Sequence, residues 1–303
     1  MSQFKKRAKF KACIIIATGV VNLYSAFQTS SGAIRISGEE KDSLIVLQLA
    51  DFASRAQRDY QRFFNYPLQK KVQVYLAESD EEYQRFYGWH VPEWSSGIAY
   101  TQQRIIILKP GVYYDPASYR MTLFHEIAHL FLHDGLSAGK LPVWLNEGTA
   151  MYLSGQVLSW QDYIAVGNAL SAGKIPALGE LTSLISFTGA RARLGYMISL
   201  LAVQYIIEQH SEGQLREIIR DYSRGVAQTE VFKKNLNEDF IDYELAFYQH
   251  LKDKFKWTGF LQFDSFYLLA LVLVIILSYI SIKIRNRRIY RKWEQEESID
   301  EGG

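Results

Sequence analysis

The stretch TLFHEIAHLFLHDG places two histidines, His125 and His129, four residues apart. Residues with this spacing lie on one face of an α-helix, one turn apart, so both imidazoles can reach a single metal ion. Glu126 follows the first histidine and would place a carboxylate beside the open position of that ion. Because an ordinary amphipathic helix can also carry this pattern by chance, the rest of the chain has to decide between the two interpretations.

A third candidate ligand occurs in the next predicted helix. Glu147, in the stretch WLNEGTA, stands eighteen residues after His129. The intervening HDGLSAGKLP contains several turn-forming residues, which makes an antiparallel return of the second helix easy. Two neutral imidazoles and one carboxylate, with one position left for water, form the ligand set of a catalytic zinc centre. The sequence therefore predicts that His125, His129 and Glu147 bind Zn²⁺.

Strands are expected mainly before the helices. Alternating apolar residues predict strands at 72–76, 97–101 and 104–108, of which the last two form a hairpin. Helical spacing predicts a helix at 37–66, with Ser37 and Glu40 as a candidate capping box. A second helix is expected from Ser79, which forms another candidate capping box with Glu82. Further helices are expected from Asp115 and Pro116 to His133, from Pro142, and around 160–170, 194–210, 214–222 and 239–256. This order indicates an α+β domain.

Both ends of the chain carry an apolar run beside a basic cluster. Residues 266–282 contain no charge and can span a bilayer when the run is extended to 260, and six lysines and arginines follow. Residues 12–27 follow a basic start and suit either a signal peptide, with Ser31 and Ala33 near the cleavage site, or an uncleaved signal anchor. Since flanking basic residues tend to stay cytoplasmic, the domain between the runs is expected outside the cytoplasm.

These features divide the chain into four parts: a signal peptide or anchor at 1–33, an extracytoplasmic domain at 34–257, a transmembrane helix at 260–282 and a cytoplasmic tail at 283–303. Residues 34–260 hold 23 basic and 26 acidic side chains, so they lack the basic footprint of a nucleic-acid-binding protein. The single cysteine, Cys13, precedes the domain. The domain is therefore expected to be held by its core rather than by disulfides.

HEIAH followed by NEGTA resembles the gluzincin metallopeptidases, and LPVWLNEGTAMYLSG is especially similar to bacterial peptidase MA-like domains. The similarity extends from about Val72 through GIAY and RIIIL to GYMISLLAVQYIIEQHSEGQLREIIRDY. It implies a zincin-like mixed sheet packed on the HExxH helix and followed by a helical lobe. It also implies that His125, His129 and Glu147 bind zinc, while Glu126 acts as the base that takes a proton from the zinc-activated water.

Two further features bear on the chemistry of this site. Tyr196 is a candidate donor to the oxyanion, by analogy with tyrosines of gluzincin aminopeptidases, although a packed aromatic residue is an equally open interpretation. Arg191 and Arg193 are weaker candidates and are expected to be solvated. His133 lies about 12 Å along the helix from His125, too far to share its ion, and is expected to face solvent or to support the ligands.

Met151 departs from the gluzincin pattern. Many gluzincins carry an aspartate four residues after the distal glutamate, where it orients the first histidine, and here that position is Met151. The partner of His125 therefore stays open.

The sequence is interpreted as a membrane-tethered zinc metallopeptidase that faces outward and hydrolyses peptide or protein substrates. RIIIL is a candidate edge strand that aligns an extended peptide. One alternative is a non-catalytic binding or scaffold protein on a peptidase-like fold, which would be expected to lose Glu126 or a ligand first. Another is a metal-free membrane chaperone or receptor. All four motif residues are present, which favours the enzyme.

Overall fold

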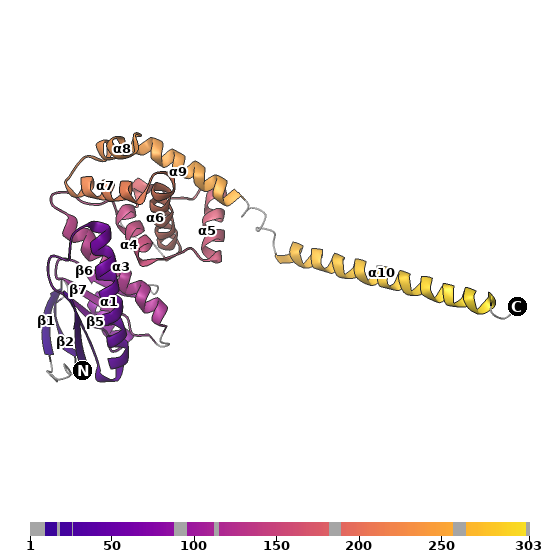
Figure 1. The fold of residues 1–303 in the computed structure, drawn as a ribbon, viewed down its shortest axis with the longest axis horizontal. Helices are drawn as coiled ribbons and strands as arrows, with labels where there is room; N and C mark the ends of the chain where they lie inside the picture. Colours follow the sequence, from indigo (N-terminus) through magenta and orange to yellow (C-terminus); the bar gives the residue numbers. More distant parts are fainter. Residues whose placement is uncertain are drawn as a thin grey trace.

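The computed structural model describes residues 10–16, 19–25, 27–87, 96–111, 115–181, 189–256 and 265–300. A five-stranded mixed sheet forms one layer of the fold (Figure 1). Its strands, in spatial order, are β3 (Phe27–Ser31), β4 (Ile34–Gly38), β5 (Val72–Leu76), β7 (Ile105–Leu108) and β6 (Gly97–Tyr100). Strands β4, β5 and β7 are parallel, whereas β3 and β6 pair antiparallel with their neighbours. The fold is thus α+β, as the sequence predicted.

Alternation along the central strands separates two buried clusters. On β7, Ile106 and Leu108 belong to the large core cluster, whereas Ile105 and Ile107 belong to a smaller one that contains Phe86. This follows from the two-residue period of a strand, which sends successive side chains to opposite faces of the sheet. The sheet is therefore covered on both faces, and β7, which has the sequence IIIL, is apolar throughout.

The predicted hairpin is confirmed, but the assignment of its outer strand was wrong. Strand β6 pairs antiparallel with β7, from Gly97 opposite Leu108 to Tyr100 opposite Ile105. On its other side β7 pairs in parallel with β5, so RIIIL is an internal strand and β6 is the edge of the sheet. The order of the strands depends on the long-range pairing of β5 with β7, which the local pattern does not reveal.

Helices α1 (Ser43–Phe64) and α3 (Pro116–Gly135) pack on the sheet, and α2 (Asp80–Tyr87) follows β5. The first helix begins later than predicted, because Ser37 lies in β4 and its hydroxyl donates to the Val74 carbonyl of β5 at 3.4 Å. A short 3₁₀ helix at Glu40–Asp42 precedes α1. The predicted capping box of Ser37 and Glu40 is therefore wrong.

Two other predicted helix starts are confirmed. Ser79 accepts a hydrogen bond from the Glu82 amide at 3.2 Å, although the Glu82 carboxylate accepts from the Glu78 amide rather than from Ser79. Asp115 caps α3 by accepting from the amides of Ala117 and Ser118 at 3.1 and 3.2 Å. These caps satisfy amide groups that have no partner within the helix.

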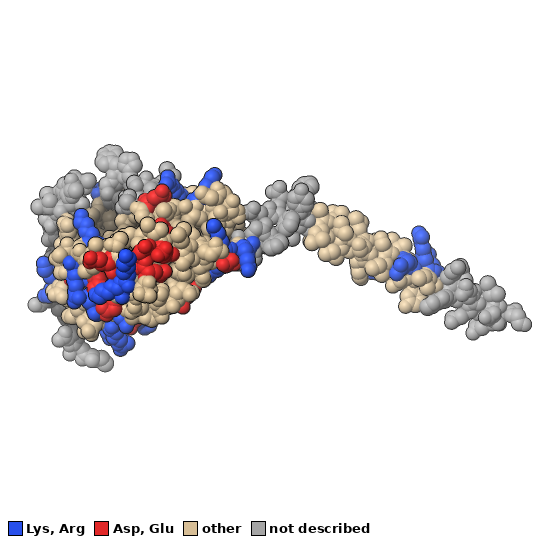
Figure 2. All heavy atoms as spheres, turned by 90° about the horizontal axis from the view of Figure 1, so that it is seen from above, with Lys and Arg blue, Asp and Glu red and all other residues tan. Residues whose placement is uncertain are grey.

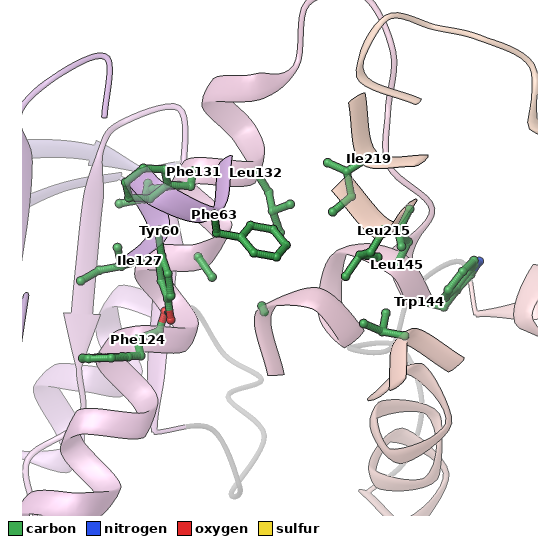
Figure 3. Packing of buried hydrophobic residues seen from close by; sticks show 14 of the residues in the cluster. Tyr60, Phe63, Phe124, Ile127, Phe131, Leu132, Trp144, Leu145, Leu215 and Ile219 are labelled. Carbon is green, nitrogen blue, oxygen red and sulfur yellow. The ribbon is translucent and has the colours of Figure 1, made fainter. Parts of the chain in front are cut away.

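An aromatic cluster joins α1 to the buried face of α3. Tyr60 lies beside Phe124 and Phe131, whose ring centroids are 6.0 and 5.8 Å from its own (Figure 3). The Tyr60 hydroxyl donates to the Phe124 carbonyl at 3.1 Å, and Phe64 stacks on Phe131 at 5.6 Å. Rings packed in this way bury much apolar surface while each polar atom keeps a partner. The face of α3 opposite to the two histidines is thereby fixed against α1.

The remaining helices form a second lobe, as predicted (Figure 1). They are α4 (Val143–Ser154), α5 (Trp160–Ser171), α6 (Gly189–Gln209), α7 (Glu212–Ser223), α8 (Gln228–Leu236) and α9 (Phe240–Phe255), of which α8 was not predicted. Figure 3 shows Trp144 and Leu145 of α4 on the same side as Leu215 and Ile219 of α7. Helices α4 and α6 cross closely at Gly148, where an added Cβ would lie 2.2 Å from the Ser199 carbonyl oxygen.

The connector between α3 and α4 is held by a single carbonyl group. The backbone amides of Ser137, Ala138 and Gly139 all donate to the Ser223 carbonyl oxygen at 3.0 Å. The Ser137 hydroxyl donates to the same oxygen at 2.9 Å. At Gly139 an added Cβ would lie 1.8 Å from the Tyr222 carbonyl oxygen, so only glycine fits. The end of α7 therefore fixes the chain that runs from the histidines to Glu147.

A buried ion pair fixes the end of α3 against the sheet. Arg104, just before β7, pairs with Asp134 at 2.6 Å, and the side chains are only 9% and 8% exposed. Arg104 also donates to the Lys70 carbonyl at 3.1 Å, and Asp134 accepts from the Gln69 amide at 2.9 Å. Removing one member of such a pair leaves the other charge buried, which typically costs about 3–5 kcal/mol.

The apolar run near the N-terminus forms strands of its own. Strands β1 (Phe10–Ile16) and β2 (Gly19–Ser25) form a separate two-stranded antiparallel sheet. Because β3 pairs with β4, the five-stranded sheet includes residues before 34, where the domain was expected to start. Whether residues 1–33 are a cleaved leader or a retained anchor stays a prediction.

Helix α10 (Ser265–Asp300) contains most of the expected transmembrane segment. Within the part of the chain that the structure describes, no helix has the length and apolarity that crossing a membrane requires. Residues 260–264 of the expected span lie outside the described residues, and α10 continues unbroken from its apolar part into the basic cluster beyond 282 (Figure 2). The transmembrane helix at 260–282 is therefore not confirmed.

Candidate metal centre

Two consecutive helices bring the three predicted ligands together. His125 and His129 lie one turn apart on α3, and Glu147 lies on α4. The Nε2 atoms of the histidines are 3.1 Å apart, and the Glu147 Oε2 atom is 3.5 Å from His125 Nε2 and 3.6 Å from His129 Nε2. All three side chains are partly buried. They are the group of candidate metal ligands found among the described residues.

These distances fit a tetrahedral metal ion. Zinc binds imidazole nitrogen and carboxylate oxygen at about 2.0–2.2 Å, which in a tetrahedral site places neighbouring ligand atoms roughly 3.3–3.6 Å apart. The separations of 3.1, 3.5 and 3.6 Å lie close to this range. Two nitrogens and one oxygen are also the donor set of a zinc site with one position left open. The residues present therefore fit a zinc ion.

The two histidines differ in the hydrogen bonding of their Nδ1 atoms. His129 Nδ1 lies 3.4 Å from the Asn146 Oδ1 atom, so Asn146 can orient this imidazole. By contrast, His125 Nδ1 is buried and has no hydrogen-bond partner among the described residues. Met151, one turn after Glu147, lines the same cavity and offers no oxygen acceptor. Asn146 was missed by the sequence analysis, although its place directly before Glu147 in NEGTA was a usable signal.

Charge coupling within the cluster is strong. Burial on its own would lower the pKa of His129, but the Glu147 carboxylate outweighs it and raises that pKa to about 9. Burial on its own would raise the pKa of Glu147, but His129 and His125 outweigh it and hold that pKa well below its usual range. Glu147 is therefore ionised across the neutral range, as a metal ligand has to be.

Glu126 lies against the edge strand β6. Its side chain is buried, and an ideal Cβ added to Gly97 of β6 would lie 3.3 Å from the Glu126 Oε1 atom and 2.6 Å from the Thr122 Cγ2 atom. Glycine at position 97 thus leaves space for the carboxylate. Burial raises the pKa of Glu126 above its usual range, and the imidazoles of His125 and His129 only partly oppose this. The carboxyl group is therefore a stronger base than an exposed one.

A cavity of about 1590 Å³ opens beside these residues. The edge strand, α3, α4, α5 and α6 contribute to its wall, and the metal cluster and Glu126 line it. Tyr196 and Arg193 line it too, and Arg193 pairs with Asp162 at 2.7 Å rather than being free. Arg191 is exposed and does not line it. The role of Tyr196 as an oxyanion donor stays a prediction.

His133 also lines the cavity, one turn beyond His129. It is not a member of the three-residue ligand group, as the sequence analysis expected. Its side chain is only partly exposed.

An HExxH helix packed under the edge of a mixed sheet, with a distal glutamate on the next helix, defines a gluzincin-type peptidase-like domain. The family model of the Peptidase MA superfamily matches residues 62–251, more than half of the 303-residue chain. The chain belongs to the Peptidase MA superfamily. A search of curated proteins found no match. The resemblance inferred from the motifs is thus confirmed, and the matched segment includes β5, the hairpin, the metal centre and most of the helical lobe.

Proposed function

We propose that this protein is a zinc-dependent metallopeptidase that hydrolyses peptide bonds. The observation that supports this most strongly is the geometry of three donor atoms, His125 Nε2, His129 Nε2 and Glu147 Oε2, next to a buried glutamate and a large cavity. A zinc ion held there would lower the pKa of a water molecule and polarise the carbonyl group of the substrate.

Glu126 supplies the proton transfer in this proposal. Its carboxylate takes a proton from the attacking water and later returns it to the amine that leaves. Burial raises its pKa, which brings it nearer to the range in which one group serves as base and then as acid around neutral pH. Tyr196, on the same cavity wall, is the candidate donor to the oxyanion.

The substrate is proposed to bind as an additional strand on β6. An edge strand has no neighbouring strand along one side, and an extended peptide can add to the sheet there. Residues 96–101, which include all of β6, line the cavity that contains the metal centre. This position replaces RIIIL, which lies inside the sheet.

The test is cleavage of a mixed peptide library by the zinc-loaded protein before and after chelation. We expect new peptide ends that disappear when a chelator removes the metal and return when zinc is added. A protein that binds zinc and peptides but produces no new ends at any pH between 5 and 9 would be the non-catalytic binding protein that the sequence left as an alternative.

The membrane location stays a prediction that rests on the basic clusters beside residues 12–27 and 260–282. It places the domain outside the cytoplasm and the tail from 283 inside. External protease on intact cells or spheroplasts is expected to digest the domain and spare the tail. Digestion of the tail with survival of the domain would reverse the orientation, and release of the whole chain on cell lysis without detergent would exclude the anchor.

A further inference from the structure

Most charged residues that line the cavity either belong to the proposed catalytic site or form an ion pair with each other. Glu147 is a candidate metal ligand, and Glu126 is the proposed base beside it. Arg193 and Asp162 pair with each other at 2.7 Å, and Asp162 also accepts from the Ser159 amide and hydroxyl. The remaining charged residue among the described lining residues is Lys140. No carboxylate of the described residues forms a salt bridge with it.

Lys140 stands on a part of the chain that the fold holds in place. The preceding residues, Ser137 to Gly139, donate three backbone hydrogen bonds to the Ser223 carbonyl, each of 3.0 Å. Lys140 is exposed, and its backbone is fixed by these contacts. Leu136 and Leu141 line the cavity on either side of Lys140 in the sequence. An apolar wall with one cation suits a ligand group that carries a negative charge on a short apolar stem.

We propose that Lys140 makes this end of the cavity a subsite for a carboxylate of the substrate peptide. The carboxylate can belong to an aspartate or glutamate side chain or to the free C-terminus of the peptide. The proposal rests on the proposed peptidase function and adds a substrate class to it. Discrimination arises because a neutral group at this subsite gains no attraction from Lys140, whereas a cationic group is repelled.

The experiment compares the wild type with Lys140→Met and Lys140→Glu. The matched control is Lys174→Glu, because Lys174 is also an exposed lysine in a loop but does not line the cavity. Each protein receives two peptide libraries of equal composition, one with free and one with amidated C-termini, and the cleavage sites are identified by mass spectrometry. Lys140 is exposed, so all variants are expected to fold.

We expect acidic residues to be enriched at one position near the cleaved bond in the wild type and in Lys174→Glu. An exposed ion pair contributes up to about fivefold in affinity. Lys140→Met should therefore lower the ratio of acidic to amide side chains at that position by about fivefold. Lys140→Glu should lower it by roughly 25-fold, because repulsion replaces attraction. If amidation alone abolishes cleavage, the carboxylate is that of the C-terminus. Identical preferences in all four proteins would overturn the proposal.

Binding separates a failure of this proposal from a failure of the peptidase function. If no protein cleaves either library, peptides captured by the zinc-loaded wild type and by Lys140→Glu are compared instead. Enrichment of acidic peptides by the wild type, lost in Lys140→Glu, supports the subsite on a non-catalytic protein. Equal capture of acidic and amide peptides by both overturns the subsite.

Discussion

Glutamine in place of Glu126 is expected to leave zinc bound and to lower the turnover number for peptide cleavage by about 10²–10⁴-fold. The amide has nearly the same size as the carboxylate and should fit the space beside Gly97, but it can neither accept nor return a proton. Glu126 is not among the three grouped ligands, so the zinc content should not change. Turnover would be measured on a library-derived peptide at saturating concentration.

The matched control for this variant is Glu217→Gln, which makes the same chemical change on an exposed residue of α7 that pairs with Arg220. It should cleave at the wild-type rate. Unchanged turnover in Glu126→Gln with zinc still bound would remove Glu126 as the base and leave the chemistry to another group in the cavity.

Glutamine in place of Glu147 is expected to have the opposite effect, namely loss of the metal. This substitution removes a charged oxygen ligand that lies 3.5 and 3.6 Å from the two Nε2 atoms. Loss of a residue that only hydrogen-bonds to a metal ligand weakens metal binding by about 10–100-fold. Loss of the charge of a ligand itself should therefore weaken binding by at least about 100-fold. The dissociation constant for zinc, measured by competition with a chromophoric chelator, gives this value directly. A dissociation constant equal to that of the wild type would exclude Glu147 as a ligand.

Local sequence signals predicted the elements that carry the chemistry. Asp115 and Pro116 marked the start of α3, and Pro142 marked the start of α4. The spacing of His125, His129 and Glu147 needed only two helices and a short connector to bring the three side chains together. Such features depend on a few neighbouring residues and can therefore be read from the chain.

Features that depend on distant pairing were not predictable in this way. Ser37 belongs to β4, which pairs with β5 more than thirty residues later as well as with the nearby β3. RIIIL is internal because β5 occupies its second side. The hydrogen bond from Ser137, in the connector before α4, to the Ser223 carbonyl joins residues 86 positions apart. The ion pair of Arg104 with Asp134 joins residues 30 positions apart. None of these contacts leaves a periodic signal in the sequence.

The most direct test of the metal centre is the zinc content of three purified proteins, measured by elemental analysis after preparation without chelator. We expect about one zinc per chain in the wild type and in Glu126→Gln, and well below one in Glu147→Gln. The wild type is the decisive sample, because His125, His129 and Glu147 offer three ligand atoms within 4.8 Å of one another. Absence of zinc from the wild type, with no uptake when zinc is titrated in, would contradict the assignment of this cluster as a zinc site.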